Sequence, residues 1–189
     1  GRPWVRVKLA MSLDGRTALH NGHSKWITGD AARADVQRWR AKAGAILTGS
    51  GTVLADNPLL TVRLPDSEVA PVCRVILDRQ LQTPAGAHVL DGSVPTRVFH
   101  DESLTPPAHF SAVDCEGMSL KEGHLDLSKM LSRLGQLGCN EVHLEAGPVL
   151  SGALFEQGLV DELLLYIAPI FLGSKARPLM ELPPLSAMS

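Results

Sequence analysis

Residues 144–153, L-E-A-G-P-V-L-S-G-A, decide how the chain folds, because an apolar strand ends there in a carboxylate and a helix begins at once. Gly147 lets the backbone come close to a ligand, and Pro148 suits the first turn of a helix. The free amides of such a turn attract phosphate. Glu145 is therefore expected at the edge of an anion site, where a carboxylate can bind a second, polar part of the same ligand.

The composition favours one globular domain that binds a small molecule. The chain has 189 residues, of which 44% are hydrophobic, enough to bury the core of a single domain. Its 18 basic and 20 acidic residues give a formal net charge of −2, so no basic field attracts nucleic acid or anionic membranes. We therefore expect neither nucleic acid nor a membrane as a partner.

Cysteine spacing and hydropathy indicate a cytoplasmic protein. The three cysteines, Cys73, Cys115 and Cys139, are odd in number and widely spaced, which supports neither a disulfide framework nor a zinc site. The longest apolar run, at 163–172, is too short to cross a bilayer, and no apolar leader opens the sequence. The seven histidines show no metal-ligand spacing, so we predict no metal site and assign the histidines no role.

Strand and helix patterns alternate along the chain. At 4–10, Val5, Val7 and Leu9 share one face of a strand and Lys8 lies on the other. Strands are predicted at 4–10, 45–48, 73–77, 97–100, 110–113, 141–145 and 162–168. Helices are predicted from a cap at Thr28 or Asp30 to Gly44, at 127–137 with Asp126 as the cap, and at 148–157. This order predicts an α/β fold with a mostly parallel central sheet and helices on both faces.

A second glycine turn, G-S-G at 49–51, follows the strand at 45–48. Thr52, Asp56 and Arg63 lie shortly after it and supply a hydroxyl, a carboxylate and a planar cation. One such turn most often marks only a loop. Two of them at strand ends predict a ligand site between them, because ligands of parallel sheets bind beyond the carboxyl ends of the strands.

Five motifs resemble those of the reductase domain of the bacterial riboflavin-biosynthesis protein RibD. They are KLAMSLDGRTA at 8–18, SKWIT at 24–28, DVQRWR at 35–40, TVLADNPLLTVR at 52–63, and EAGPVLSG at 145–152 with VDELLLYIAP following. They occur in the family's order near both ends of the chain. The resemblance implies a dihydrofolate-reductase-like fold and an enzyme that uses NADPH to reduce the ribosyl group of 5-amino-6-(5-phosphoribosylamino)uracil to a ribityl chain.

The resemblance also implies site residues. Substrate contacts of the family correspond to Ser24, Arg40, Leu60, Arg63 and Glu145. Cofactor contacts correspond to Ala10, Trp26, Thr52, Asp56, Gly147, Pro148, Val149, Leu150, Ser151, Gly152 and Ala153. The two arginines suit the sugar phosphate, since a guanidinium can donate two parallel hydrogen bonds to it.

Lys8 and Glu145 are expected at the reacting centre. There they would orient the imine formed when the sugar opens at C1′ and would stabilise charge as the hydride moves. The preference for NADPH over NADH comes from the resemblance alone. Arg79, which follows a strand end, is a candidate for the cation that binds the 2′-phosphate.

The residue patterns also allow structural roles for most of these side chains. Lys8 is typical of a solvated strand residue, and Arg40 of a surface arginine whose stem covers an apolar stripe. Trp26 fits a core position, and Asp56 fits a turn. Glu145 is the exception, because packing does not explain a strand-end carboxylate beside a Gly-Pro helix start.

We expect residues 1–189 to form a single reductase domain that is truncated at its C-terminus, with a partner subunit completing the sheet edge in a homodimer. The deaminase signature that usually precedes this domain in the family, H-x-E with P-C-x-x-C, is absent here. A fused deaminase domain in the full-length protein stays open. Two other functions also stay open: a dihydrofolate-type reductase with Asp30 or Asp35 as the acid, and a non-catalytic module that binds nucleotides or phosphosugars.

Overall fold

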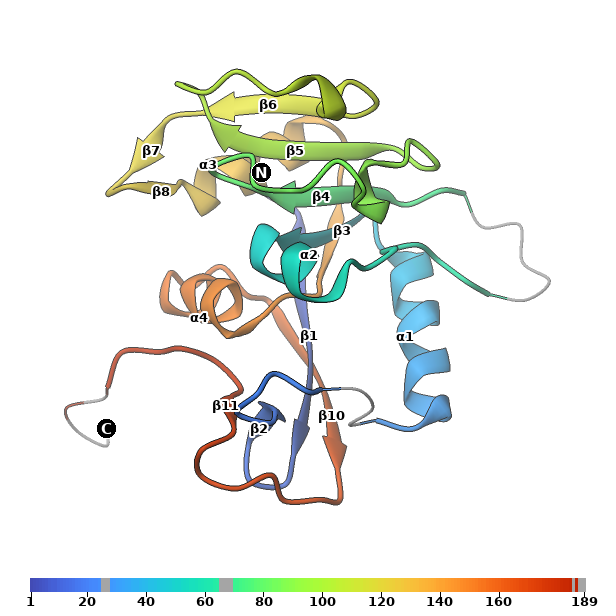
Figure 1. The fold of residues 1–189 in the computed structure, drawn as a ribbon, viewed down its shortest axis with the longest axis vertical. Helices are drawn as coiled ribbons and strands as arrows, with labels where there is room; N and C mark the ends of the chain where they lie inside the picture. The colour runs from blue at the N-terminus through green and yellow to red at the C-terminus, as the bar shows by residue number, and fades with distance from the viewer. Residues whose placement is uncertain (25–27, 65–69, 185, 187–189) are drawn as a thin grey trace.

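The structure, a computed structural model, describes residues 1–24, 28–64, 70–184 and 186, and a seven-stranded sheet forms its centre (Figure 1). The strands run in the order β10-β1-β9-β3-β4-β5-β6, and every neighbouring pair is parallel. Their bounds are Trp4–Ser12 for β1, Ala45–Gly49 for β3, Cys73–Leu77 for β4, Thr96–Asp101 for β5, Asp114–Met118 for β6, Glu141–Leu144 for β9 and Glu162–Ala168 for β10.

In the described part of the chain, four α-helices cover the two faces of this sheet. They are α1 (Asp30–Lys42), α2 (Ser50–Asp56), α3 (Leu127–Gln136) and α4 (Pro148–Glu156). Two short antiparallel pairs lie outside it: β2 (Arg16–Ala18) with β11 (Arg177–Pro178), and β7 (Leu120–Lys121) with β8 (His124–Leu125). Single 3-10 turns occur at His88–Leu90 and Ala108–Phe110. In Figure 1, α1 and α4 lie on opposite sides of β1.

Alternation along the strands creates two apolar cores. On one face, Val7, Leu47 and Leu144 pack with Met130 of α3 and Leu154 of α4. On the other face, residues one position away, such as Ile46 and Ile76, pack with Val53 of α2. A parallel sheet with helices on both faces is therefore confirmed, because each strand of this kind must bury both of its sides.

Helix α1 packs on the sheet largely through polar side chains. The Arg6 guanidinium of β1 lies 4.3 Å from the centroid of the Trp39 ring and forms ion pairs with Glu141 and Glu162. The Tyr166 hydroxyl of β10 donates a hydrogen bond of 2.7 Å to Asp35 of α1. The packing of α1 on the sheet therefore depends on paired charges as well as on buried apolar area.

The predicted strands at 73–77 and 162–168 have the observed bounds, and four more strands and two helices lie within two residues of them. The predicted cap of the first helix was wrong. Gly29 is the N-cap, with no side-chain hydrogen bond, and α1 ends at Lys42. Asp126 does cap α3, accepting a hydrogen bond from the Lys129 amide.

Two further predictions were wrong. Residues 110–113 form no strand: Phe110 ends a 3-10 turn, and the edge strand β6 begins only at Asp114. Pairing with β5 decides this placement, since the sequence of β6, D-C-E-G-M, has little strand propensity. The segment at 49–51 is more than a turn, because it opens α2, whose C-cap, Asn57, has a left-handed conformation.

Gly152 of α4 has a packing role. A Cβ atom there would overlap the carbonyl group of Glu181, whose amide donates a hydrogen bond of 3.1 Å to the Pro148 carbonyl. We predict that Gly152→Ala lowers the free energy of unfolding by about 2 kcal/mol, because the backbone at Glu181 must move. Chemical denaturation measures this. Gly51→Ala is the matched control, since its Cβ meets no atom within 4 Å, and equal stability of the two variants would contradict the prediction.

Candidate active site

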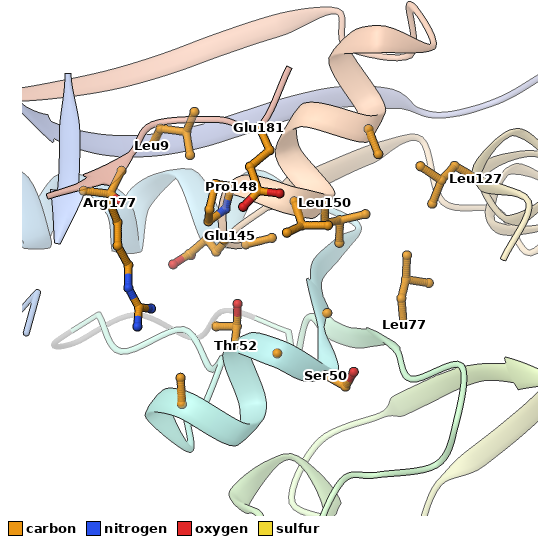
Figure 2. A pocket seen from close by; sticks show the side chains of 18 of the residues that line it. Leu9, Ser50, Thr52, Leu77, Leu127, Glu145, Pro148, Leu150, Arg177 and Glu181 are labelled. Carbon is orange, nitrogen blue, oxygen red and sulfur yellow. The ribbon is translucent and has the colours of Figure 1, made fainter. Parts of the chain in front are cut away.

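A cavity of about 1320 Å³ lies at the carboxyl ends of β9, β3 and β4 and beside residues 8–10 of the longer strand β1. The neighbouring strands β9 and β3 are followed by α4 and α2, which turn to opposite faces of the sheet. Such a divergence opens a crevice at the sheet edge, where ligands of parallel α/β proteins bind. Figure 2 shows this space between Ser50 and Thr52 of α2 and Pro148 and Leu150 of α4.

Lys8 and Glu145 are brought together at one end of this cavity. Val7 of β1 is paired with Leu144 of β9, so the next residues along the two strands are Lys8 and Glu145. Both line the cavity, and each affects the charge of the other. The sequence predicted both residues, and the parallel register places them side by side.

Glu145 is ionised through its contacts with cations. Burial raises the pKa of this carboxyl group, but contacts with His143 and Arg40 and the charges of Arg40 and Lys8 outweigh burial and hold the pKa well below its usual range. Arg40 Nε donates to Oε1 at 2.5 Å, and Nη2 donates to Oε2 at 2.9 Å. Both side chains are largely buried, with 9% and 15% of their surfaces exposed.

Lys8 is half-buried, and its environment disfavours the ammonium. Burial lowers the pKa of its amine, Arg40 lowers it further, and Glu145 acts in the opposite direction. The Nζ atom lies 5.9 Å from the centroid of the Tyr166 ring. The site therefore combines a fixed carboxylate with an amine that gives up its proton more readily than a lysine in water.

The structure gathers most of the predicted site residues around the cavity. Those that line it are Lys8, Ala10, Ser24, Thr52, Asp56, Glu145, Gly147, Pro148, Val149, Leu150 and Ala153. Five others are not among the lining residues: Arg40, Leu60, Arg63, Ser151 and Gly152. Trp26 lies outside the described residues.

Arg40 binds Glu145 and the chain segment after α2. Besides its two bonds to Glu145, Arg40 donates from Nη1 to the Thr61 carbonyl at 2.8 Å, so all three of its nitrogens bind protein atoms. These bonds use three of the five N–H groups of the guanidinium, so one N–H on Nη1 and one on Nη2 remain, and the predicted phosphate contact stays a prediction. Leu60 is 3% exposed and packs in the core. Arg63 is exposed, and its backbone amide donates a hydrogen bond to Gln37 of α1.

The start of α4 suits a diphosphate group. Gly147 is the N-cap of this nine-residue helix, Pro148 follows it, and a Cβ atom at Gly147 would meet nothing within 4 Å. The first amides of a helix lack partners within it and carry partial positive charge. Ser151 and Gly152 are buried on the other side of the same helix, so the first turn and Ala153 line the cavity while these two residues do not.

Sequence reasoning missed several cavity residues and one neighbour of Glu145. Arg177 of β11 points into the cavity near Thr52 (Figure 2), and Lys121 and His124 of the β7–β8 hairpin also line it. No sequence motif marks them, since the fold brings them there from distant segments. His143 is different, because it precedes Glu145 by two residues, and residues so spaced on a strand share a face.

Fold and site together define an α/β protein with a ligand cavity at the carboxyl edge of a parallel sheet. The chain belongs to the RibD C-terminal domain family, whose model matches residues 3–188. It is 40% identical to the riboflavin biosynthesis protein RibD of Escherichia coli K12, covering 100% of this chain and 54% of the relative. The corresponding protein of Bacillus amyloliquefaciens is 42% identical, covering 94% of this chain and 48% of the relative.

Solved structures agree with this assignment. Acinetobacter baumannii RibD superposes with a TM-score of 0.87 at 38% identity, over 99% of this chain and 51% of that one. A deaminase/5-amino-6-(5-phosphoribosylamino)uracil reductase from Thermotoga maritima gives 0.82 at 30% identity, over 100% of this chain and 51% of that one. The chain thus spans about half the length of the curated relatives it matches. Within the described residues, no helix is long and apolar enough to span a membrane.

The Arg40–Glu145 pair yields a test of stability and of its pH dependence. We predict that Arg40→Met lowers the free energy of unfolding by about 3 kcal/mol near neutral pH, because the carboxylate loses its partner. The low pKa of Glu145 stabilises the folded state above the ordinary glutamate pKa of about 4.3, and this contribution fades as the pH falls.

The deficit of Arg40→Met should therefore be smaller at about pH 4 than at about pH 7 when both proteins are unfolded with urea. Arg38→Met is the matched control, since that arginine is 67% exposed on the same helix and lies 3.7 Å from Asp35. A deficit that does not change with pH would show that Arg40 acts through packing alone.

Proposed function

We propose that this chain is the reductase part of a RibD-type protein and that it reduces the ribosyl group of 5-amino-6-(5-phosphoribosylamino)uracil with NADPH. The observation that carries the proposal is the Lys8–Glu145 pair in the wall of a cavity that also contains the first turn of α4. The Thermotoga maritima protein, named as a reductase of this uracil, supports the substrate because its match covers this whole chain.

The residues suit the reduction of an opened ribosylamine, which needs a hydride at C1′ and a proton at the attached nitrogen. NADPH, when bound, supplies the hydride. Glu145 is held ionised and so has no proton to give. Lys8, whose pKa burial lowers, is the better proton donor, and the charge of Glu145 holds the Lys8 ammonium near the substrate before the proton moves.

The order of groups along the cavity matches the order of groups in NADPH. Lys8 lies on β1, Gly147 follows β9, Gly49 ends β3, and Arg79 lies two residues beyond β4. These neighbouring strands span about 14 Å, at about 4.8 Å a step. A dinucleotide laid across them has its reduced ring near Lys8, its diphosphate at α4 and its adenosine toward Arg79.

The far end of the cavity offers cations for the 2′-phosphate. Arg79 and Lys121 line it there, and Arg79 Nη1 donates a hydrogen bond to the Gly123 carbonyl, which holds the arginine against the β7–β8 turn. Ligand pockets commonly hold about 300–1,000 Å³. At about 1320 Å³, this cavity has room for a cofactor and a substrate together.

The dihydrofolate alternative is less well supported, because it needs a carboxylic acid in the cavity on α1. Asp35 accepts hydrogen bonds from Trp39 and Tyr166, Asp30 pairs with Arg33, and neither lines the cavity. The alternative of a non-catalytic binding module predicts binding without turnover.

A direct experiment separates the three functions. Loss of NADPH absorbance is followed with the ribosylaminouracil phosphate and, separately, with dihydrofolate, while NADPH binding is measured by fluorescence. Oxidation with the first compound alone supports the proposal. Oxidation with dihydrofolate alone contradicts it, and binding without oxidation of either compound favours the module.

Glu145→Gln tests the reacting centre, since it keeps the shape of the side chain and removes its charge. We predict that kcat falls by about 100-fold while the Kd of NADPH changes less than about threefold. The matched control is Glu156→Gln, an exposed carboxylate elsewhere in the cavity wall, which should retain its turnover. Unchanged turnover in Glu145→Gln would remove this residue from the chemistry.

Arg79→Gln tests the cofactor preference. We predict that the Kd of NADPH rises by about tenfold while the Kd of NADH stays the same, because only NADPH carries the phosphate that the guanidinium binds. Arg133→Gln, in α3 and outside the cavity lining, is the control, and both dissociation constants should stay unchanged in it. Equal weakening of both cofactors by Arg79→Gln would assign Arg79 to a part of the ligand that they share.

A further inference from the structure

His143 is a buried histidine beside the reacting centre that the proposed chemistry does not use. It lies on β9, its side chain is 0% exposed, and its Nε2 atom is 3.4 Å from Oε1 of Glu145. Neither of its ring nitrogens forms a hydrogen bond with any of the described residues. The ring therefore lies within 4 Å of the carboxylate that the proposed reaction depends on.

Such a side chain is costly for the fold. A buried polar group without a hydrogen bond loses its hydration and gains little in return. A leucine would fill a similar volume without that loss. The imidazole is therefore poorly explained as packing alone, and the carboxylate at 3.4 Å indicates where its effect lies.

The sheet holds the ring in place. His143 is paired with Arg6 of β1 on one side and with Ile46 of β3 on the other, so its backbone lies in the middle of the sheet. The charged groups related to it are Glu145, Arg6 of β1 and Glu162 of β10, while Arg40 and Lys8 act on the same Glu145 carboxylate. Arg6 is already paired with Glu141 and Glu162, so among these groups Glu145 faces the ring most directly.

We propose that His143 is a positioning residue that fixes the orientation of the Glu145 carboxylate for the reaction. A carboxylate oxygen only accepts, so the nitrogen that faces it must carry a proton, which sets the Nε2–H tautomer. The separation of 3.4 Å is long for a hydrogen bond, so the N–H dipole acts electrostatically through a dry, poorly screening interior.

As a consequence, the Glu145 carboxylate can accept one more hydrogen bond. Oε1 faces both Arg40 Nε and His143 Nε2, and Oε2 accepts from Arg40 Nη2. Each oxygen has two lone pairs, so the remaining one, on Oε2, is available to Lys8 or a substrate. This inference rests on the role proposed above for Glu145 in the reaction, although the contact itself is independent of any activity.

The contact is tested first without turnover. ¹⁵N spectra of histidine-labelled protein distinguish the two imidazole tautomers, and His143 should carry its proton on Nε2. In Glu145→Gln, the His143 signal should move. The signal of His100, a buried histidine on β5 whose Nδ1 lies 2.8 Å from the Asp101 carbonyl oxygen, should stay in place. The inference would be overturned if the His143 ring were protonated only on Nδ1, or if the His143 signal were the same in wild-type protein and in Glu145→Gln.

The effect on the reaction is tested with two substitutions. His143→Leu should lower kcat by about fivefold and leave the Kd of NADPH unchanged. His143→Gln should restore most of the loss, because its amide places a donor where Nε2 stands. His100→Leu is the matched control for loss of a buried histidine and should keep the wild-type kcat.

The outcomes separate this inference from the proposed function. If wild-type protein binds NADPH but does not oxidise it with the ribosylaminouracil phosphate, the proposed function fails, and the spectra still decide the contact. If wild-type protein turns over and His143→Leu has the same kcat, the positioning role is wrong. The role is also wrong if His143→Gln turns over no faster than His143→Leu.

Discussion

The buried ion pair between Arg40 and Glu145 is the constraint on which the site depends. Taking both charges out of water costs free energy, and two hydrogen bonds in parallel geometry offset that cost. Because Arg40 also binds the Thr61 carbonyl, one guanidinium ties α1 to the end of β9 and to the segment after α2. The carboxylate is thereby fixed before any ligand arrives, which is the condition for electrostatic catalysis.

One face of the sheet carries the main apolar core, and the other carries the charged groups near the site. On the face covered by α3 and α4, apolar side chains such as Val7, Met130 and Leu154 pack closely and make the frame rigid. On the face under α1, the strand residues that alternate with these apolar ones are polar and include Arg6, Lys8 and His143. Charges can be buried there because neighbouring strands supply Glu141, Glu162 and Glu145, and α1 adds the Trp39 ring and Arg40.

Membership of the RibD C-terminal domain family and the site geometry support each other through independent observations. The family rests on likeness along the whole chain, whereas the cavity, the ionised Glu145 and the lowered pKa of Lys8 come from this structure alone. The structure also separates the arginines that line the cavity from the one that binds Glu145. Arg40, which a motif assigns to phosphate, is bound to Glu145, while Arg79 and Arg177 reach the cavity from segments that no motif marks.

Local patterns predicted much of this structure because they report on short stretches of chain. Alternation located β1 and β10, the Gly-Pro pair located the start of α4, and Glu145 stood out as a carboxylate without a packing explanation. The edge strand β6 and the short helix α2 were missed, since pairing with β5 and contact with the second core form them more than propensity does.

By itself, then, the sequence determined the α/β fold, the order of most elements and the identity of the two side chains proposed to react. The tertiary structure alone decided which groups meet them. His143, Arg40 and Lys8 come from a strand, a helix and a second strand, and only parallel register and the packing of α1 bring them to one carboxylate. Charges separated by many residues of chain acquire their pKa values only from neighbours in space, and no local pattern contains those neighbours.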